Sequence, residues 1–236
     1  MLLMSVYYKV LLFLAVIPGF YLLYKVYKWD TVEKEPMGLI IRLVIAGVIS
    51  TIPAMILEVF IDGVFAGLGF DSGFFYNLIS CFMGVALIEE LCKYLLLRIF
   101  SWRSKAFDYV FDGIVYGVCV GVGFAVFENV LYVFDSGIAL AIQRALTAVP
   151  AHVIFGIYMG HNYGLAKQCE KHGDTEGKKA YLMHALLMPI LLHGFYDFCL
   201  TEGTLLTVII FYVFIIWLDK KAIRDIKRFS QQDELL

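Results

Sequence analysis

Seven long apolar stretches follow one another along the sequence, and each is close to the length that crosses a bilayer as a helix. A transmembrane helix needs about 20 mostly apolar residues. Only 17% of the residues are charged, against about 25% in soluble domains, so the chain has too little polar surface to cover a water-soluble globule. We therefore predict an all-α, polytopic transmembrane bundle in which residues 1–236 form a single membrane domain. The predicted spans are 2–24, 37–60, 74–98, 109–134, 138–166, 180–200 and 204–218.

The basic residues gather in alternate loops between these stretches. Lysines and arginines follow the first, third, fifth and seventh spans, whereas the loops 61–73, 135–137 and 201–203 contain acids and no basic residue. Because cytoplasmic loops are enriched in lysine and arginine, we predict an N-terminus outside the cell and a C-terminus in the cytoplasm. The basic residues form no stripe that could follow a phosphate backbone, so we expect no nucleic-acid partner.

Glycines repeat at four-residue spacing in two neighbouring predicted spans. Such stripes allow two helix backbones to approach closely in a membrane. On a helical wheel, Glu128 lies about 20° from Gly121, and His152 lies about 40° from Gly156. We therefore predict that Glu128 and His152 face packed protein and not lipid. The two stripes are Gly113, Gly117 and Gly121, then Gly156, Gly160 and Gly164.

Ionisable side chains occur inside the predicted spans, where a charge costs about 2.5 kcal/mol or more and usually marks a functional site. Glu89 and Glu90 are adjacent, and Lys93 lies within one helical turn of both. A Glu–Lys ion pair explains one of these acids and leaves the other unexplained. Two acids side by side in a low dielectric repel each other, and enzymes use such pairs for acid–base chemistry. The full set is Glu58, Glu89, Glu90, Lys93, Glu128, Arg144, His152, His161, His184, His193 and Asp197.

Histidines supply the second half of the candidate site. His193 and Asp197 are four residues apart, so the carboxylate can orient the imidazole, although a purely structural pair is an alternative. His152 could likewise serve only to hydrogen-bond two helices. Together with the acids, these groups come from four predicted spans. Such a set can hold zinc with a bound water, or use glutamate as a base and histidine to stabilise an oxyanion. We interpret His161 and His184, near the cytoplasmic ends, as structural.

Three motifs occur in order along the chain. E-E-L-C-K (89–93), F-A-V-F-E (124–128) and H-G-F-Y-D (193–197) resemble the E-E-x-x-K, F-x-x-x-E and H-x-x-x-D motifs of the bacterial PrsW family. The P-A-H at 150–152 fits a histidine between the second and third motifs. The resemblance implies a multi-pass intramembrane protease of the bacterial inner membrane, related to the type II CAAX prenyl proteases of the ABI superfamily. It implies a catalytic core at about 74–200, with the other spans peripheral.

The resemblance also implies a substrate and roles for the site residues. Family members make the first, extracytoplasmic-side cut in a single-span anti-sigma factor during a stress response. By motif, Glu89 and Glu90 would activate the attacking water, and Lys93 would tune this pair of acids. Asp197 would orient His193. Zinc is the candidate metal and a metal-free glutamate mechanism is the alternative; the residues that would bind metal or stabilise the oxyanion are Glu128, His152 and His193.

Two other classes of function fit part of the sequence. Proton- or cation-coupled transporters also use buried relays of glutamate, histidine and aspartate, although the sequence has no internal repeat of the kind many transporters show. A membrane scaffold would explain His161 and His184 but not two adjacent buried acids. The sequence contains no H-E-x-x-H zinc helix and no G-x-S-x-G nucleophile motif, which excludes two common hydrolase classes.

Overall fold

The computed structural model describes residues 2–233 and 235–236, and nearly all of these residues are helical. Within this part of the chain no strand forms, and a single isolated bridge joins Tyr109 to Leu235. The all-α prediction is therefore confirmed. The helices are α1 (Leu2–Trp29), α2 (Met37–Gly67), α3 (Phe74–Ile79), the π-helix η1 (Ser80–Ala86), α4 (Leu87–Ser101), α5 (Val110–Leu146), α6 (Ala148–Lys171), α7 (Thr175–Glu202) and α8 (Leu205–Gln231).

Among the residues that the structure describes, five helical segments are long and apolar enough to cross a membrane, which confirms the polytopic character of the chain. Two predicted spans are not among these five. The third coincides with α3, η1 and α4, which follow one another without a break from 74 to 101, and the seventh coincides with the first half of α8. The count of seven spans and the orientation of the termini stay predictions. The five segments are Met4–Trp29, Met37–Gly67, Val110–Phe134, Ser136–Lys171 and Thr175–Glu202.

Helix α5 lies at the centre of the bundle, because glycines let two neighbours approach its backbone. A methyl group on Gly117 would lie 2.3 Å from the carbonyl oxygen of Gly156 in α6. On another face of α5, a methyl group on Gly123 would lie 2.0 Å from the carbonyl oxygen of Val44 in α2. The predicted close contact between the two glycine stripes is therefore confirmed, and α2 is a second helix in backbone contact with α5.

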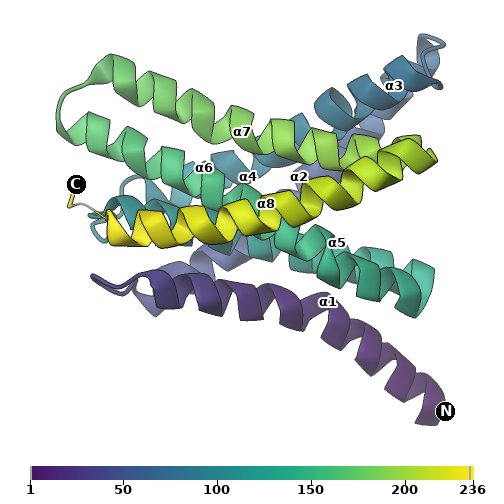
Figure 1. Ribbon diagram of the computed structural model, residues 1–236, viewed down its shortest axis with the longest axis horizontal. Helices are drawn as coiled ribbons and strands as arrows, with labels where there is room; N and C mark the ends of the chain where they lie inside the picture. The colour runs from purple at the N-terminus through teal and green to yellow at the C-terminus, as the bar shows by residue number, and fades with distance from the viewer. Residues whose placement is uncertain (1, 234) are drawn as a thin grey trace.

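The remaining helices surround this centre (Figure 1). Helices α6 and α7 form an antiparallel hairpin, and α8 runs across the bundle in the same view. Helix α1 lies at one edge, where Leu11 and Ala15 pack against Val133 and Ala141 of α5. Large apolar side chains such as Phe60 and Ile99 remain exposed, which suits contact with membrane lipids.

Two departures from regular α-helix place residues near the polar interior. Gly137 has a φ of +82°, so α5 consists of two segments and its second segment turns back with Arg144 toward Glu128. The π-helix Ser80–Ala86 comes directly before the turn that carries Glu89 and Glu90. Short π-helical stretches are frequent at functional sites because they shift the side chains that follow them around the helix axis.

Candidate active site

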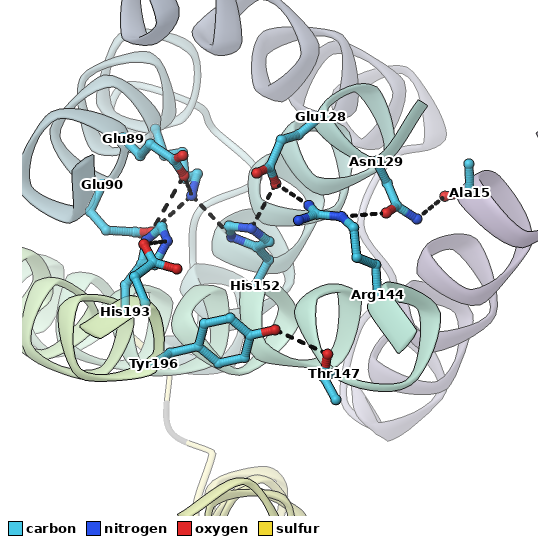
Figure 2. Close-up of polar contacts among 12 residues, drawn as sticks. Ala15, Glu89, Glu90, Glu128, Asn129, Arg144, Thr147, His152, His193 and Tyr196 are labelled. Carbon is cyan, nitrogen blue, oxygen red and sulfur yellow. Dashed lines mark hydrogen bonds and ion pairs between the residues drawn. The ribbon is translucent and has the colours of Figure 1, made fainter. Parts of the chain in front are cut away.

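Polar side chains from four helices meet in the interior of the bundle (Figure 2). Each of Glu89, Glu90, His152 and His193 is at most 5% exposed, and Glu128 joins them through its bond to His152. The prediction that Glu128 and His152 face packed protein is confirmed. Helix α4 contributes two acids and a lysine, α5 contributes Glu128, α6 contributes His152, and α7 contributes His193 and Asp197.

Lys93 links the two adjacent acids to the first histidine. Its Nζ lies 3.0 Å from Glu89 Oε2, 2.8 Å from Glu90 Oε1 and 3.1 Å from His152 Nδ1. A lysine ammonium has three N–H donors, so each has an acceptor. The cation also lies 3.8 Å from the centre of the Phe124 ring, close enough for a cation–π interaction. The Glu–Lys ion pair therefore includes both acids, and not only one.

His193 lies between carboxylates on both sides of its ring. Nδ1 is 2.9 Å from Glu90 Oε1, and Nε2 is 3.2 Å from Asp197 Oδ2. The ring stacks on Phe155 with the two ring centres 5.1 Å apart. The next residue, Gly194, lets α7 pack closely on η1, because a methyl group there would lie 2.5 Å from the Phe82 ring. The orientation of the imidazole is thus fixed from three directions.

Glu128 connects His152 to a second basic residue. His152 Nε2 and Arg144 Nη2 each lie 3.0 Å from Glu128 Oε2. Since His152 Nδ1 accepts from the Lys93 ammonium, Nε2 is the nitrogen that carries the hydrogen and donates it to Glu128. Arg144 Nε donates to Asn129 Oδ1 at 2.8 Å. Neither Arg144 nor Asn129 was predicted from the sequence to belong to the site. The sequence did indicate that Arg144 is unusual, because it is a basic residue inside a predicted span.

A cavity of about 710 Å³ leads to this network. Ligand pockets in proteins have about this size, roughly 300–1,000 Å³. Glu89 is among the residues that line the cavity, whereas Glu90 lies behind it and is 1% exposed. The other network residues in the lining are Glu128, Arg144, His152, His193 and Asp197.

Helix α2 also contributes to the cavity wall, with Thr51, Met55, Glu58 and Val59. The predicted core 74–200 contains all six candidate site residues but not this helix. We therefore propose that α2 belongs with the core.

His161 lies outside the lining of this cavity. It stacks on Phe229 of α8, with ring centres 3.6 Å apart, which agrees with a structural role.

Four residues of the network could hold a metal ion. Glu89, Glu90, His152 and His193 each offer one donor atom, and these atoms lie within 4.8 Å of one another. Carboxylate oxygen and imidazole nitrogen are usual zinc ligands. Of the three predicted ligands, both histidines belong to this group. The third, Glu128, is bonded to His152 instead, which is the usual position of a carboxylate that orients a metal-binding histidine.

The fold and the site together define a polytopic membrane protein with an enclosed acid–histidine centre at the base of a cavity. Residues 35–218 match the PrsW family of intramembrane metalloproteases. The chain belongs to this family, and it is a multi-pass bacterial membrane peptidase.

Similar proteins agree with this assignment over most of their length. The chain is 36% identical to Protease PrsW of Oceanobacillus iheyensis over 205 residues, which is 86% of this chain and 89% of that protein. It is 36% identical to Protease PrsW of Geobacillus kaustophilus, over 79% of this chain and 77% of that protein. For Protease PrsW of Bacillus subtilis the identity is 33%, over 86% and 89% respectively. No solved structure matches the chain.

Proposed function

We propose that this peptidase hydrolyses a peptide bond in or beside the membrane-spanning segment of a single-span protein, as in the first cut of an anti-sigma factor. The observation that supports it is the presence of acids and histidines from five helices, α2 and α4 to α7, on the wall of one cavity. Tyr76, Asn77, Ser136 and Thr201 also line this cavity, and they lie near the loops that the distribution of basic residues predicts to be outside. A cut on the extracytoplasmic side follows from that orientation.

In the proposed mechanism, Glu89 is the general base because it is the member of the acid pair that lines the cavity. It takes a proton from a water molecule as the water oxygen bonds to the substrate carbonyl carbon. The negative charge that develops on the carbonyl oxygen is stabilised by an N–H of His193 or His152, which exchanges its present acceptor for the oxyanion. Glu89 then gives the proton to the amide nitrogen as the C–N bond breaks.

The other side chains of the network hold Glu89, His152 and His193 in place. Lys93 keeps the two acids together in spite of their repulsion, and Glu90 fixes one side of the His193 ring. Glu128 and Arg144 fix His152. We propose zinc as the metal of this chain. Glu90, His152 and His193 would hold it, which leaves Glu89 free to act as the base, and its chemistry would be to polarise the substrate carbonyl.

His193→Ala tests this proposal when the purified protein is reconstituted in liposomes with a single-span, anti-sigma-factor-like protein. We expect the cleavage rate to fall about 100-fold or more, because one oxyanion donor is typically worth about 100- to 1,000-fold. His184→Ala is the matched control, since His184 is exposed, and it should cleave within about twofold of wild type, as surface substitutions usually have small effects. Equal rates for His193→Ala and wild type would rule out this function for the site.

Asp197→Asn should have a smaller effect. The amide keeps the shape of the side chain but loses the charge that faces His193 Nε2 at 3.2 Å. Because carboxylates of this kind usually contribute about 10- to 100-fold, we expect cleavage to fall within that range. Cleavage kinetics would measure this loss. A loss of about 1,000-fold, as large as that expected when the general base Glu89 is removed, would indicate that Asp197 itself takes part in proton transfer.

A further inference from the structure

The position of Lys93 has a consequence for metal binding. Three of the four residues that could hold the metal already bond to its ammonium group: Glu89, Glu90 and His152, at 2.8 to 3.1 Å. The nitrogen lone pair of His152 Nδ1 can accept an N–H or bind a metal, but not both at once. A dication among these donors would also lie next to the ammonium, at a distance where two positive charges repel strongly in a low dielectric.

We propose that the Lys93 ammonium and the metal compete for the same donor atoms, so that the metal binds fully only after Lys93 has moved away from them. In the metal-free protein, the lysine is the cation that holds two buried acids together. When the metal binds, it takes over this role and the ammonium leaves its three acceptors. Lys93 therefore lowers the affinity of the site for metal.

The Phe124 ring provides a second position for the displaced ammonium group. Its ammonium already lies over Phe124, and the Phe124 ring is part of the cavity wall. A lysine head group sits on a flexible four-carbon chain, and an aromatic face stabilises a cation without taking up any carboxylate. Movement along this ring toward the cavity frees both acids and His152 without a change in the helices.

The proposal predicts that removing Lys93 raises the affinity for metal, whereas removing a residue that supports the metal ligands lowers it. Removing a residue that orients metal ligands usually lowers metal affinity by about 10- to 100-fold. Removing a competitor raises the affinity. Lys93→Met keeps the length of the side chain and removes its charge, so we expect zinc to bind this variant about 10-fold more tightly than wild type, or more. Zinc affinity is measured in detergent by competition with a chromophoric chelator.

Arg144→Met controls for the general effect of removing one positive charge near the site. Arg144 contacts Glu128 and Asn129, and it bonds to none of the four donor residues. We expect its zinc affinity to fall by up to about 10-fold and not to rise, because Arg144 holds the Glu128 carboxylate that orients His152. If Lys93→Met binds zinc no more tightly than wild type, or if Arg144→Met binds as tightly as Lys93→Met, the proposal is wrong.

The wild-type protein offers a second test if Lys93→Met folds poorly. Saturating zinc should expose the displaced amine, so that labelling of Lys93 by a small, membrane-permeant amine reagent increases, as measured by peptide mass spectrometry. Lys179, whose side chain is 66% exposed, should be labelled equally with and without zinc. Unchanged or lower labelling of Lys93 would contradict the proposal. Neither test uses cleavage, so failure of the proposed function and failure of this inference can be told apart.

Discussion

Glu89→Gln should lower the rate of substrate cleavage about 1,000-fold, because general acid–base catalysis contributes roughly 100- to 10,000-fold. The amide has the size of the carboxylate, and its oxygen can still accept from Lys93, which lies 3.0 Å away. It cannot accept a proton from water near neutral pH. The folded structure should therefore persist while the reaction stops. Initial rates in proteoliposomes measure the effect, and thermal unfolding in detergent shows whether the variant is folded.

The matched control for this variant is Glu176→Gln. Glu176 lies in the first turn of α7, and its side chain is 85% exposed. The same chemical change there should leave cleavage at the wild-type rate. If Glu89→Gln is folded and retains more than a tenth of the wild-type rate, Glu89 is not the base. Glu90→Gln would then be the next variant to measure, since Glu90 is the other acid of the pair.

Gly117→Ala should strongly destabilise the bundle, because the added methyl group would meet backbone atoms that cannot turn aside. It would lie 2.3 Å from the carbonyl oxygen of Gly156, and either α5 or α6 would have to move. Overpacking that forces the backbone to shift typically costs about 1–3 kcal/mol. Cleavage should fall as well, because Glu128 and His152 lie on these two helices and their 3.0 Å bond depends on the helix spacing. Thermal unfolding followed by circular dichroism measures the change in stability.

Gly63→Ala is the control for the change in helix propensity. Gly63 lies inside α2, and a methyl group on it would meet no atom within 4 Å. Alanine favours helix over glycine by about 1 kcal/mol, so this variant should unfold at the wild-type temperature or slightly above it. If Gly117→Ala and Gly63→Ala unfold at the same temperature, the close packing of α5 on α6 does not stabilise the bundle.

Much of the fold could be predicted from apolar length and from small-residue spacing. The all-α, polytopic character follows from long apolar stretches, since a bilayer leaves the backbone no other way to satisfy its hydrogen bonds than helices or closed barrels. The contact between α5 and α6 follows from glycines four residues apart, which lie on one face of a helix. The inward direction of Glu128 and His152 follows from their angular distance to these glycines.

The details of the site could not be predicted, because they depend on irregular geometry. The predicted span 74–98 was a regular α-helix, whereas the structure has a π-helix before Glu89. No sequence pattern indicates where the extra residue of a π-helical turn is inserted. The return of Arg144 toward Glu128 depends on the left-handed backbone of Gly137. The part that α2 plays in the cavity depends on how it packs against α4, η1 and α5, which helical periodicity does not determine.

The contacts of Lys93 could be predicted from the sequence only in part. Helical spacing places the lysine near Glu89 and Glu90, but it says nothing of His152, which is 59 residues away. Only the packing of α4 and α6 against the same two helices, α5 and α7, brings Nδ1 of this histidine to the ammonium. The predicted ligand set therefore included Glu128 and left out the acid pair, whereas the structure groups the acid pair with the two histidines.

The most direct test of the central claim is to run the cleavage reaction in water enriched in oxygen-18 and to analyse both products by mass spectrometry. We expect the new C-terminal carboxyl group to carry one heavy oxygen, and the cut to lie within or beside the membrane-spanning segment, toward its outer end. Intact substrate after incubation with folded wild-type protein would contradict a hydrolytic centre among these helices, as would a cut in a region remote from the membrane.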